Sequence, residues 1–168
     1  YEEITYEGYG PGGVALLVET ATDNKNRTAA EVRSIFSKAG SQMAGQGSVA
    51  WQFEPRGLIA VAGGSGDPDA IALAAIDAGA TDVDTESDPI EISTEPSELL
   101  KVQTSLEEAG VKVDSAELAM VAKTLIEVDV DKARSNLKLI EALEESDDVQ
   151  RVTANFELPD EILAEAAG

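Results

Sequence analysis

The sequence predicts an α+β protein in which a discontinuous α/β-sandwich domain carries an inserted ferredoxin-like domain. Three observations lead to this prediction. Apolar residues switch between strand-like and helix-like spacing along the chain. Residues 58–121 follow the order β-α-β-β-α-β, which is the ferredoxin-like motif. The elements of residues 1–57 are incomplete alone, and those of residues 122–168 complete them.

The first domain opens with two predicted strands. Residues 3–9 alternate polar and apolar side chains, and residues 14–18 form an apolar run typical of a strand buried on both faces. A helix is expected from Thr28, because the threonine oxygen and the Glu31 carboxylate match a capping box. Gly40 is expected to end this helix.

The remaining elements follow from the same patterns. Residues 47–54 alternate, which predicts a half-buried strand with one apolar face made of Val49, Trp51 and Phe53. In the insert we expect strands over residues 58–62, 82–85, 90–93 and 111–118, with helices over 67–78 and 95–109. After it we expect a strand over 124–128, a helix over 131–145 and a strand over 149–156.

A glycine-rich stretch between the first two strands matches the spacing of a dinucleotide-binding motif. Its turn residues are Gly8, Gly10, Pro11, Gly12 and Gly13. That motif requires a helix directly after the glycines, so that the helix N-terminus can hold a pyrophosphate. An apolar strand follows here instead. The motif therefore predicts a tight hairpin and no cofactor.

Composition excludes several classes of function. The chain has 168 residues, 33 of them acidic and 12 basic, with no histidine and no cysteine, for a net charge of −21. A thiolate nucleophile, an imidazole base and the usual zinc sites are excluded. Paired carboxylates are abundant at helix ends, where nothing separates their pKa values for acid-base work. We therefore expect a protein that is not an enzyme, binds no metal, has no membrane span and lies in the cytoplasm.

The charge is unevenly distributed along the chain. Residues 1–56 contain seven acidic and five basic side chains, whereas the remaining residues contain 26 acidic and seven basic ones. Residues 25–38 carry four bases and one acid. This stretch is either a solvated helix face or a contact for a polyanion. The candidate contact residues are Lys25, Asn26, Arg27, Arg33 and Lys38.

Several long motifs resemble the YebC/PmpR family. They lie at residues 6–15, 22–28, 31–33, 47–51, 78–83 and 143–150. The resemblance implies that the chain holds the second and third domains of a three-domain protein, whose first, basic helical domain is absent here. Pro55 replaces a base that is usual in the family, which weakens a phosphate contact at that hairpin.

The resemblance implies a regulator of gene expression, and three hypotheses follow. The first is a DNA-binding transcriptional regulator that relies mainly on the absent basic domain. The second is a ribosome-associated translation factor, because a mitochondrial family member activates translation; such a member would be mitochondrial rather than cytoplasmic. The third is a module that binds proteins or small molecules, with its acidic surface facing a protein partner.

Overall fold

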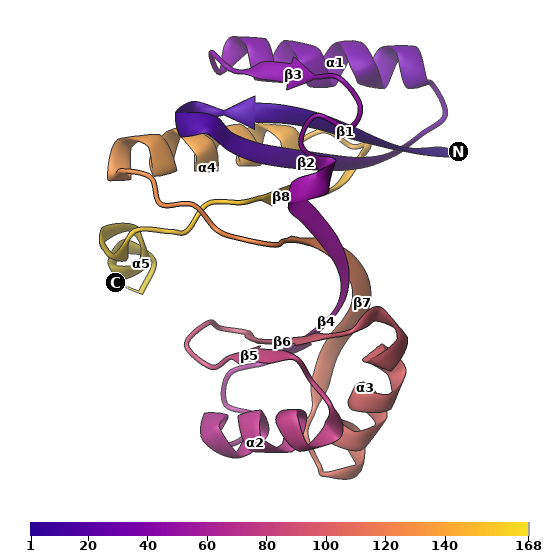
Figure 1. Cartoon of the computed structure of the whole chain (residues 1–168), viewed down its shortest axis with the longest axis vertical. Coiled ribbons are helices and arrows are strands. Elements are labelled where there is room, and N and C mark those ends of the chain that lie inside the picture. Colours follow the sequence, from indigo (N-terminus) through magenta and orange to yellow (C-terminus); the bar gives the residue numbers. More distant parts are fainter. Residues whose placement is uncertain (168) are drawn as a thin grey trace. The chain divides into compact units, whose positions relative to one another are not determined.

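The computed structural model describes residues 1–167, with side chains through Glu165, and contains helices and two antiparallel sheets (Figure 1). The predicted α+β class is therefore confirmed. The chain divides into two compact units. One unit comprises Tyr1–Glu54 and the chain from Val121 onward, and the other comprises Pro55–Met120.

The first unit holds a four-stranded sheet in the order β3-β1-β2-β8. Its elements are β1 (Glu2–Gly10), the 3₁₀ turn η1 (Pro11–Gly13), β2 (Val14–Thr22), α1 (Lys25–Lys38), β3 (Gln42–Ala44), the 3₁₀ turn η2 (Ala50–Gln52), α4 (Val130–Glu144), β8 (Val149–Ala154) and α5 (Asp160–Ala167). Strands β1 and β2 form a long antiparallel hairpin, in register from the pair Glu2 and Thr22 to the pair Gly10 and Val14.

The core of the first unit forms on β2. The five residues of its apolar run, Val14 to Val18, are all buried, as expected for a strand covered on both faces. Helix α1 contributes Val32 and Phe36 to this core, and α4 contributes Leu139 and Leu143. Each pair is four residues apart, so both members lie on the same helix face.

The second unit has its own sheet, in the order β5-β6-β4-β7. Its elements are β4 (Phe53–Val61), α2 (Pro68–Ala78), β5 (Asp82–Asp84), β6 (Ile90–Thr94), the 3₁₀ turn η3 (Pro96–Glu98), α3 (Leu99–Glu108) and β7 (Val113–Ala122). Strand β6 pairs antiparallel with both β4 and β5. This order, with two helices packed on a separate apolar core, is the ferredoxin-like arrangement.

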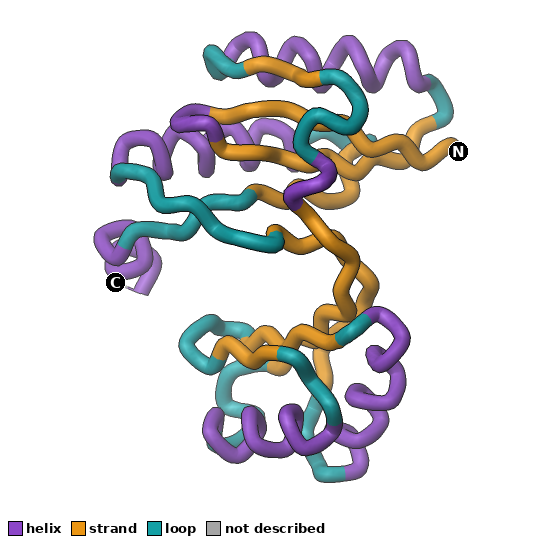
Figure 2. The backbone as a smooth tube through the Cα atoms, in the orientation of Figure 1, coloured by secondary structure: helices purple, strands orange, loops and turns teal. Residues whose placement is uncertain are grey.

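Two predicted strands are wrong. The strand expected over residues 47–54 is a loop followed by η2, and β4 then runs without a break from Phe53 to Val61 (Figure 2). Pairing of β4 with β6 begins only at Gly57, so no N–H donor toward β6 is needed at Pro55. The strand expected over residues 124–128 is reduced to one bridge between Ile126 and Phe156.

A buried carboxylate organises the loop between β3 and β4. Glu7 on β1 is only 4% exposed. Its Oε2 accepts from Gly47 N at 2.6 Å, and its Oε1 accepts from Val49 N at 2.8 Å and Ala50 N at 2.7 Å. Burial raises the pKa of Glu7, but the three N–H donors outweigh this effect and leave the pKa below its ordinary value. The loop is thus folded around one negative charge.

A second polar side chain fixes the other end of the same segment. Asn155 follows β8 and is buried. Its Oδ1 accepts from Ala15 N at 2.8 Å, and its Nδ2 donates to Gln52 Oε1 at 2.9 Å. The Gln52 carbonyl in turn accepts from Lys123 N at 2.9 Å. The residues of η2 are therefore held between Glu7 on one side and Asn155 on the other.

We predict that Glu7→Gln destabilises the chain by about 1–3 kcal/mol at neutral pH, measured by urea unfolding. The substituted amide nitrogen would face a backbone N–H, which leaves a buried donor without an acceptor. Glu3→Gln on the same strand is the matched control, because Glu3 is exposed. A Glu7→Gln variant as stable as the Glu3→Gln variant would contradict the assigned role.

The contribution of Glu7 to the free energy of unfolding should depend on pH with a defined sign. The folded-state pKa of Glu7 is lowered from 4.5, so the unfolded chain binds more protons in acid. Its contribution to stability is therefore complete above that value and is lost as the pH falls through the folded-state pKa. The stability gap between wild type and Glu7→Gln should narrow over this acidic window. A gap that is constant from neutral pH into acid would contradict this linkage.

Candidate nucleic-acid and partner interface

The predicted contact residues lie on α1, but the helix starts earlier than the capping box implied. Asn24 is the N-cap, and its side-chain oxygen accepts from Arg27 N at 3.1 Å. Lys25, Asn26 and Arg27 therefore form the first helical turn rather than a loop. The capping role assigned to Thr28 is wrong, because its hydroxyl is buried and donates to Asp148 Oδ2 at 2.7 Å.

Arg27 closes an ion-pair cluster inside the first unit. Its Nη2 lies 3.0 Å from Asp23 Oδ1 and 3.1 Å from Asp148 Oδ2. The hydrogen bond from Thr28, followed by that from Arg27, lowers the pKa of Asp148. The hydrogen bonds to Asp148 and Asp23 raise the pKa of Arg27. The guanidinium thus joins the start of α1 to the turn between α4 and β8.

The other predicted contact residues, Lys25, Asn26, Arg33 and Lys38, are exposed. A helix of 14 residues is about 20 Å long, so Lys25 and Lys38 lie at opposite ends of α1. Asn26 and Arg33 are seven residues apart and share one face. Lys38 lines a groove between α1 and α4 together with Glu31 and Glu145. The structure therefore spreads these bases along the helix instead of gathering them into one patch.

The glycine-rich motif forms the tight β1–β2 connection. Gly8 and Gly10 end β1, and Pro11, Gly12 and Gly13 form η1. A Cβ atom at Gly8 would lie 2.5 Å from the Phe36 ring, and one at Gly10 would overlap the Asn136 side-chain oxygen. Gly12 and Gly13 have φ angles of 80° and 78°, in the left-handed region that favours glycine.

The motif therefore serves packing within the first unit. Asn136 on α4 is buried, and its Nδ2 donates to the Pro11 carbonyl at 2.9 Å. The strand β2 follows the turn directly, so the glycines do not open a helix as the dinucleotide-binding motif requires. Close approach of α1 and α4 to β1 explains why side chains are missing at Gly8 and Gly10.

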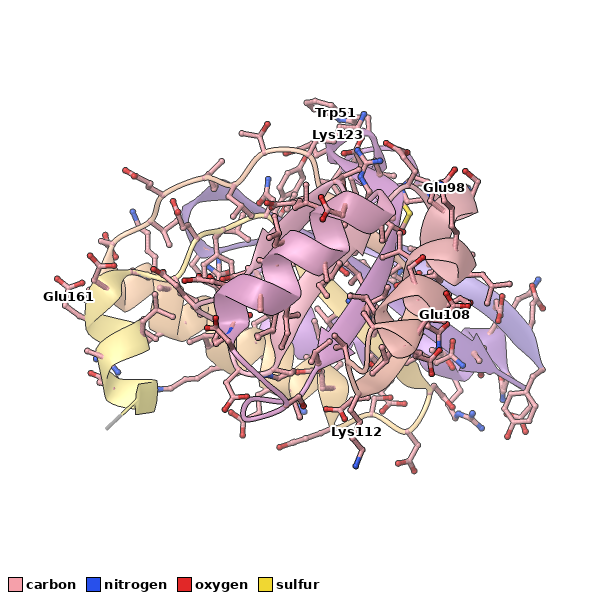
Figure 3. All side chains as sticks on the ribbon, turned by 90° about the horizontal axis from the view of Figure 1, so that it is seen from below. Trp51, Glu98, Glu108, Lys112, Lys123 and Glu161 are labelled. Atoms are coloured by element: carbon pink, nitrogen blue, oxygen red, sulfur yellow. The ribbon has the colours of Figure 1, made fainter. Side chains whose placement is uncertain are left out.

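Trp51 is a surface residue that the sequence pattern misassigned. The alternation of residues 47–54 predicts that Trp51 lies on the apolar face of a strand. In the structure it lies in η2 with 67% of its surface exposed. Its neighbours Val49 and Phe53 are buried as expected. The indole lies close to Lys123 in the first unit (Figure 3), where Lys123 N donates to the carbonyl of the neighbouring Gln52. An exposed tryptophan beside a lysine is a further candidate contact.

The described part of the chain has neither a metal-binding cluster nor a membrane-spanning helix. Within residues 1–167, no group of three or more acidic side chains is arranged to hold a metal ion. No helix in this part of the chain is both long and apolar enough to cross a bilayer.

We predict that Gly10→Ala costs about 1–3 kcal/mol of stability, because the added methyl group overlaps Asn136 and forces it to move. Urea unfolding measures the change. Gly45→Ala is the matched control, since its nearest neighbouring atom would be Ser48 Oγ at 3.9 Å. Equal stability of the two variants would show that the close approach to α4 is unimportant.

Comparisons with known proteins agree with this architecture. A solved structure, described as a conserved hypothetical protein from Aquifex aeolicus, is similar with a TM-score of 0.92 and 42% sequence identity. The similarity covers 96% of this chain and 67% of that protein.

Sequence relatives and a family model identify the family of this chain. A protein of Rubrobacter xylanophilus is 48% identical over the whole chain and 67% of its own length. A protein of Acidithiobacillus ferrooxidans is 53% identical over 98% of the chain and 65% of its own length. Both are named "Probable transcriptional regulatory protein", and the chain spans about two thirds of each. The model described as "TACO1/YebC second and third domain" matches residues 1–156, so the chain belongs to the TACO1/YebC family.

Proposed function

We propose that this chain is the non-enzymatic, acidic part of a cytoplasmic regulator of gene expression whose partner is a nucleic acid or a nucleoprotein complex. The observation that carries the proposal is the family match over residues 1–156, together with relatives named as transcriptional regulatory proteins. DNA is the partner that those names suggest.

Charge limits what this chain contributes to binding DNA. At a net charge of −21, the chain repels a phosphate backbone over most of its surface. Arg27 forms ion pairs with two carboxylates within the protein, which leaves Lys25, Arg33 and Lys38 as the other exposed basic residues of α1. Three separated bases release few counterions. Most of the affinity for nucleic acid must therefore come from a basic segment outside these residues, with α1 orienting the acidic body.

A second candidate partner is the ribosome. Proteins that bind duplex DNA usually contact it with basic side chains clustered on an element that follows the groove. The basic side chains of α1 are instead spread along about 20 Å of helix. RNA-binding proteins more often use exposed aromatic side chains that stack on unpaired bases, and Trp51 is such a side chain. This observation supports a role in translation.

The test is charge reversal on α1 of the full-length protein. We predict that Lys25→Glu with Arg33→Glu lowers the nucleic acid recovered by crosslinking in cells severalfold, while the melting temperature stays within about 2 °C of wild type. Lys101→Glu with Lys112→Glu makes the same charge change at exposed positions of the second unit and should leave recovery unchanged.

Sequencing the recovered material separates the two partners. Promoter DNA supports the transcriptional regulator, and ribosomal or transfer RNA supports the translation factor. Unchanged recovery with the α1 variant would show that this helix is a solvated face. Recovery of neither nucleic acid from wild type would contradict the proposed function as a whole.

A further inference from the structure

Trp51 is rigidly held although its ring is open to solvent. The indole Nε1 donates to the Ser48 carbonyl at 3.0 Å. On one side of it, the amides of Val49 and Ala50 are bound by the Glu7 carboxylate. On the other side, Gln52 is bound by Asn155 and by Lys123 N. Fixing the backbone on both sides of an exposed aromatic ring reduces the entropy that the ring loses when a ligand stacks on it.

The surroundings of Trp51 differ from the rest of this acidic molecule. Residues 39–53 form the longest stretch of the chain without a charged side chain. The first acidic residue after it, Glu54, is half-buried and already engaged in an interaction. This stretch itself therefore adds no negative side chain that would repel a phosphate group. The carboxylate bound to it, that of Glu7, is buried and accepts hydrogen bonds from three backbone N–H groups.

A lysine lies next to this uncharged stretch. Lys123 N donates to the carbonyl of Gln52, the residue after Trp51, at 2.9 Å. The Lys123 side chain is exposed and lies beside the indole (Figure 3). Among residues 1–165, whose side chains the structure describes, no acidic group forms an ion pair with it. A flat aromatic face and an available ammonium group thus occur together.

We propose that Trp51 and Lys123 bind one unpaired nucleotide of a single-stranded nucleic acid, with the base stacked on the indole and a phosphate at the lysine ammonium. The proposal rests on the proposed function, because it assumes a nucleic-acid partner. Stacking on an aromatic ring tolerates any base and requires that the base be free of a duplex.

A nucleotide fits this site better than a protein partner. Tryptophan hot spots in protein interfaces lie in well-packed, desolvated pockets. The loop that carries Trp51 is instead made of glycine, glutamine and serine from residue 45 to residue 48. Such side chains offer hydrogen bonds around the ring rather than apolar packing.

The chain offers a direct probe, because Trp51 is its only tryptophan. A single-stranded oligouridylate of about 12 nucleotides should quench the tryptophan fluorescence in a saturable way at low ionic strength. The same length of duplex RNA should quench it much less. No quenching by the single strand would overturn the proposal.

Variants separate the two side chains. Trp51→Ala should weaken binding of a fluorescein-labelled oligouridylate about 10-fold or more, measured by anisotropy, and Trp51→Phe should recover part of the loss. Lys123→Gln should weaken binding and reduce the slope of log affinity against log salt by about 0.7. Lys112→Gln removes an equal charge from the second unit and should do neither. Identical binding by Lys123→Gln and Lys112→Gln would overturn the role of Lys123.

Failure of the Trp51–Lys123 site can be distinguished from failure of the proposed function. If crosslinking in cells recovers nucleic acid equally with wild type and with Trp51→Ala, the regulator function stands and this site is wrong. If Trp51→Ala instead loses a bound protein while oligouridylate binding is unchanged, Trp51 belongs to a protein interface and the nucleotide site is also wrong.

Discussion

The first unit depends on a single buried carboxylate bound by three backbone N–H groups. Glu7 replaces its hydration with hydrogen bonds from Gly47, Val49 and Ala50, which is the condition under which a charge can be buried at modest cost. The loop in turn has no helix or strand to satisfy these donors over residues 45–49. Each partner therefore needs the other, and the exposed turn that follows takes its geometry from this contact.

The charged residues of the first unit fall into two groups: those bound within the protein, and those exposed to a partner. Glu7 and the Asp148–Arg27 pair are used within the first unit, where they join loops and helix ends to the sheet. The bases that remain exposed are spread along α1, and the exposed aromatic residue lies in a different element, η2. An acidic body with such separate contacts suits a protein that positions a nucleic-acid complex more than one that grips a duplex unaided.

The sequence was sufficient for the fold class and for the buried strands and helices, because apolar periodicity reports which faces are buried. The run from Val14 to Val18 and the order of the inserted domain were both apparent from it. The sequence did not predict the short edge strand β3. It was insufficient wherever a distant polar group decided the local structure. Thr28 fits a capping box, yet its hydroxyl donates a hydrogen bond to Asp148, which lies 120 residues away in the sequence. The alternation around Trp51 suggests a strand, but Glu7 and Asn155 fold that segment into a turn. Along β1 itself, nothing distinguishes Glu7 from the exposed Glu3.

Time-resolved fluorescence anisotropy of Trp51 tests the central claim most directly, because this residue is the only tryptophan in the chain. If the Glu7 carboxylate holds the turn, the indole of wild type should rotate only with the whole molecule. In Glu7→Gln it should gain a fast local motion at a temperature where both proteins are folded. Equal local mobility of Trp51 in the two proteins would contradict the account.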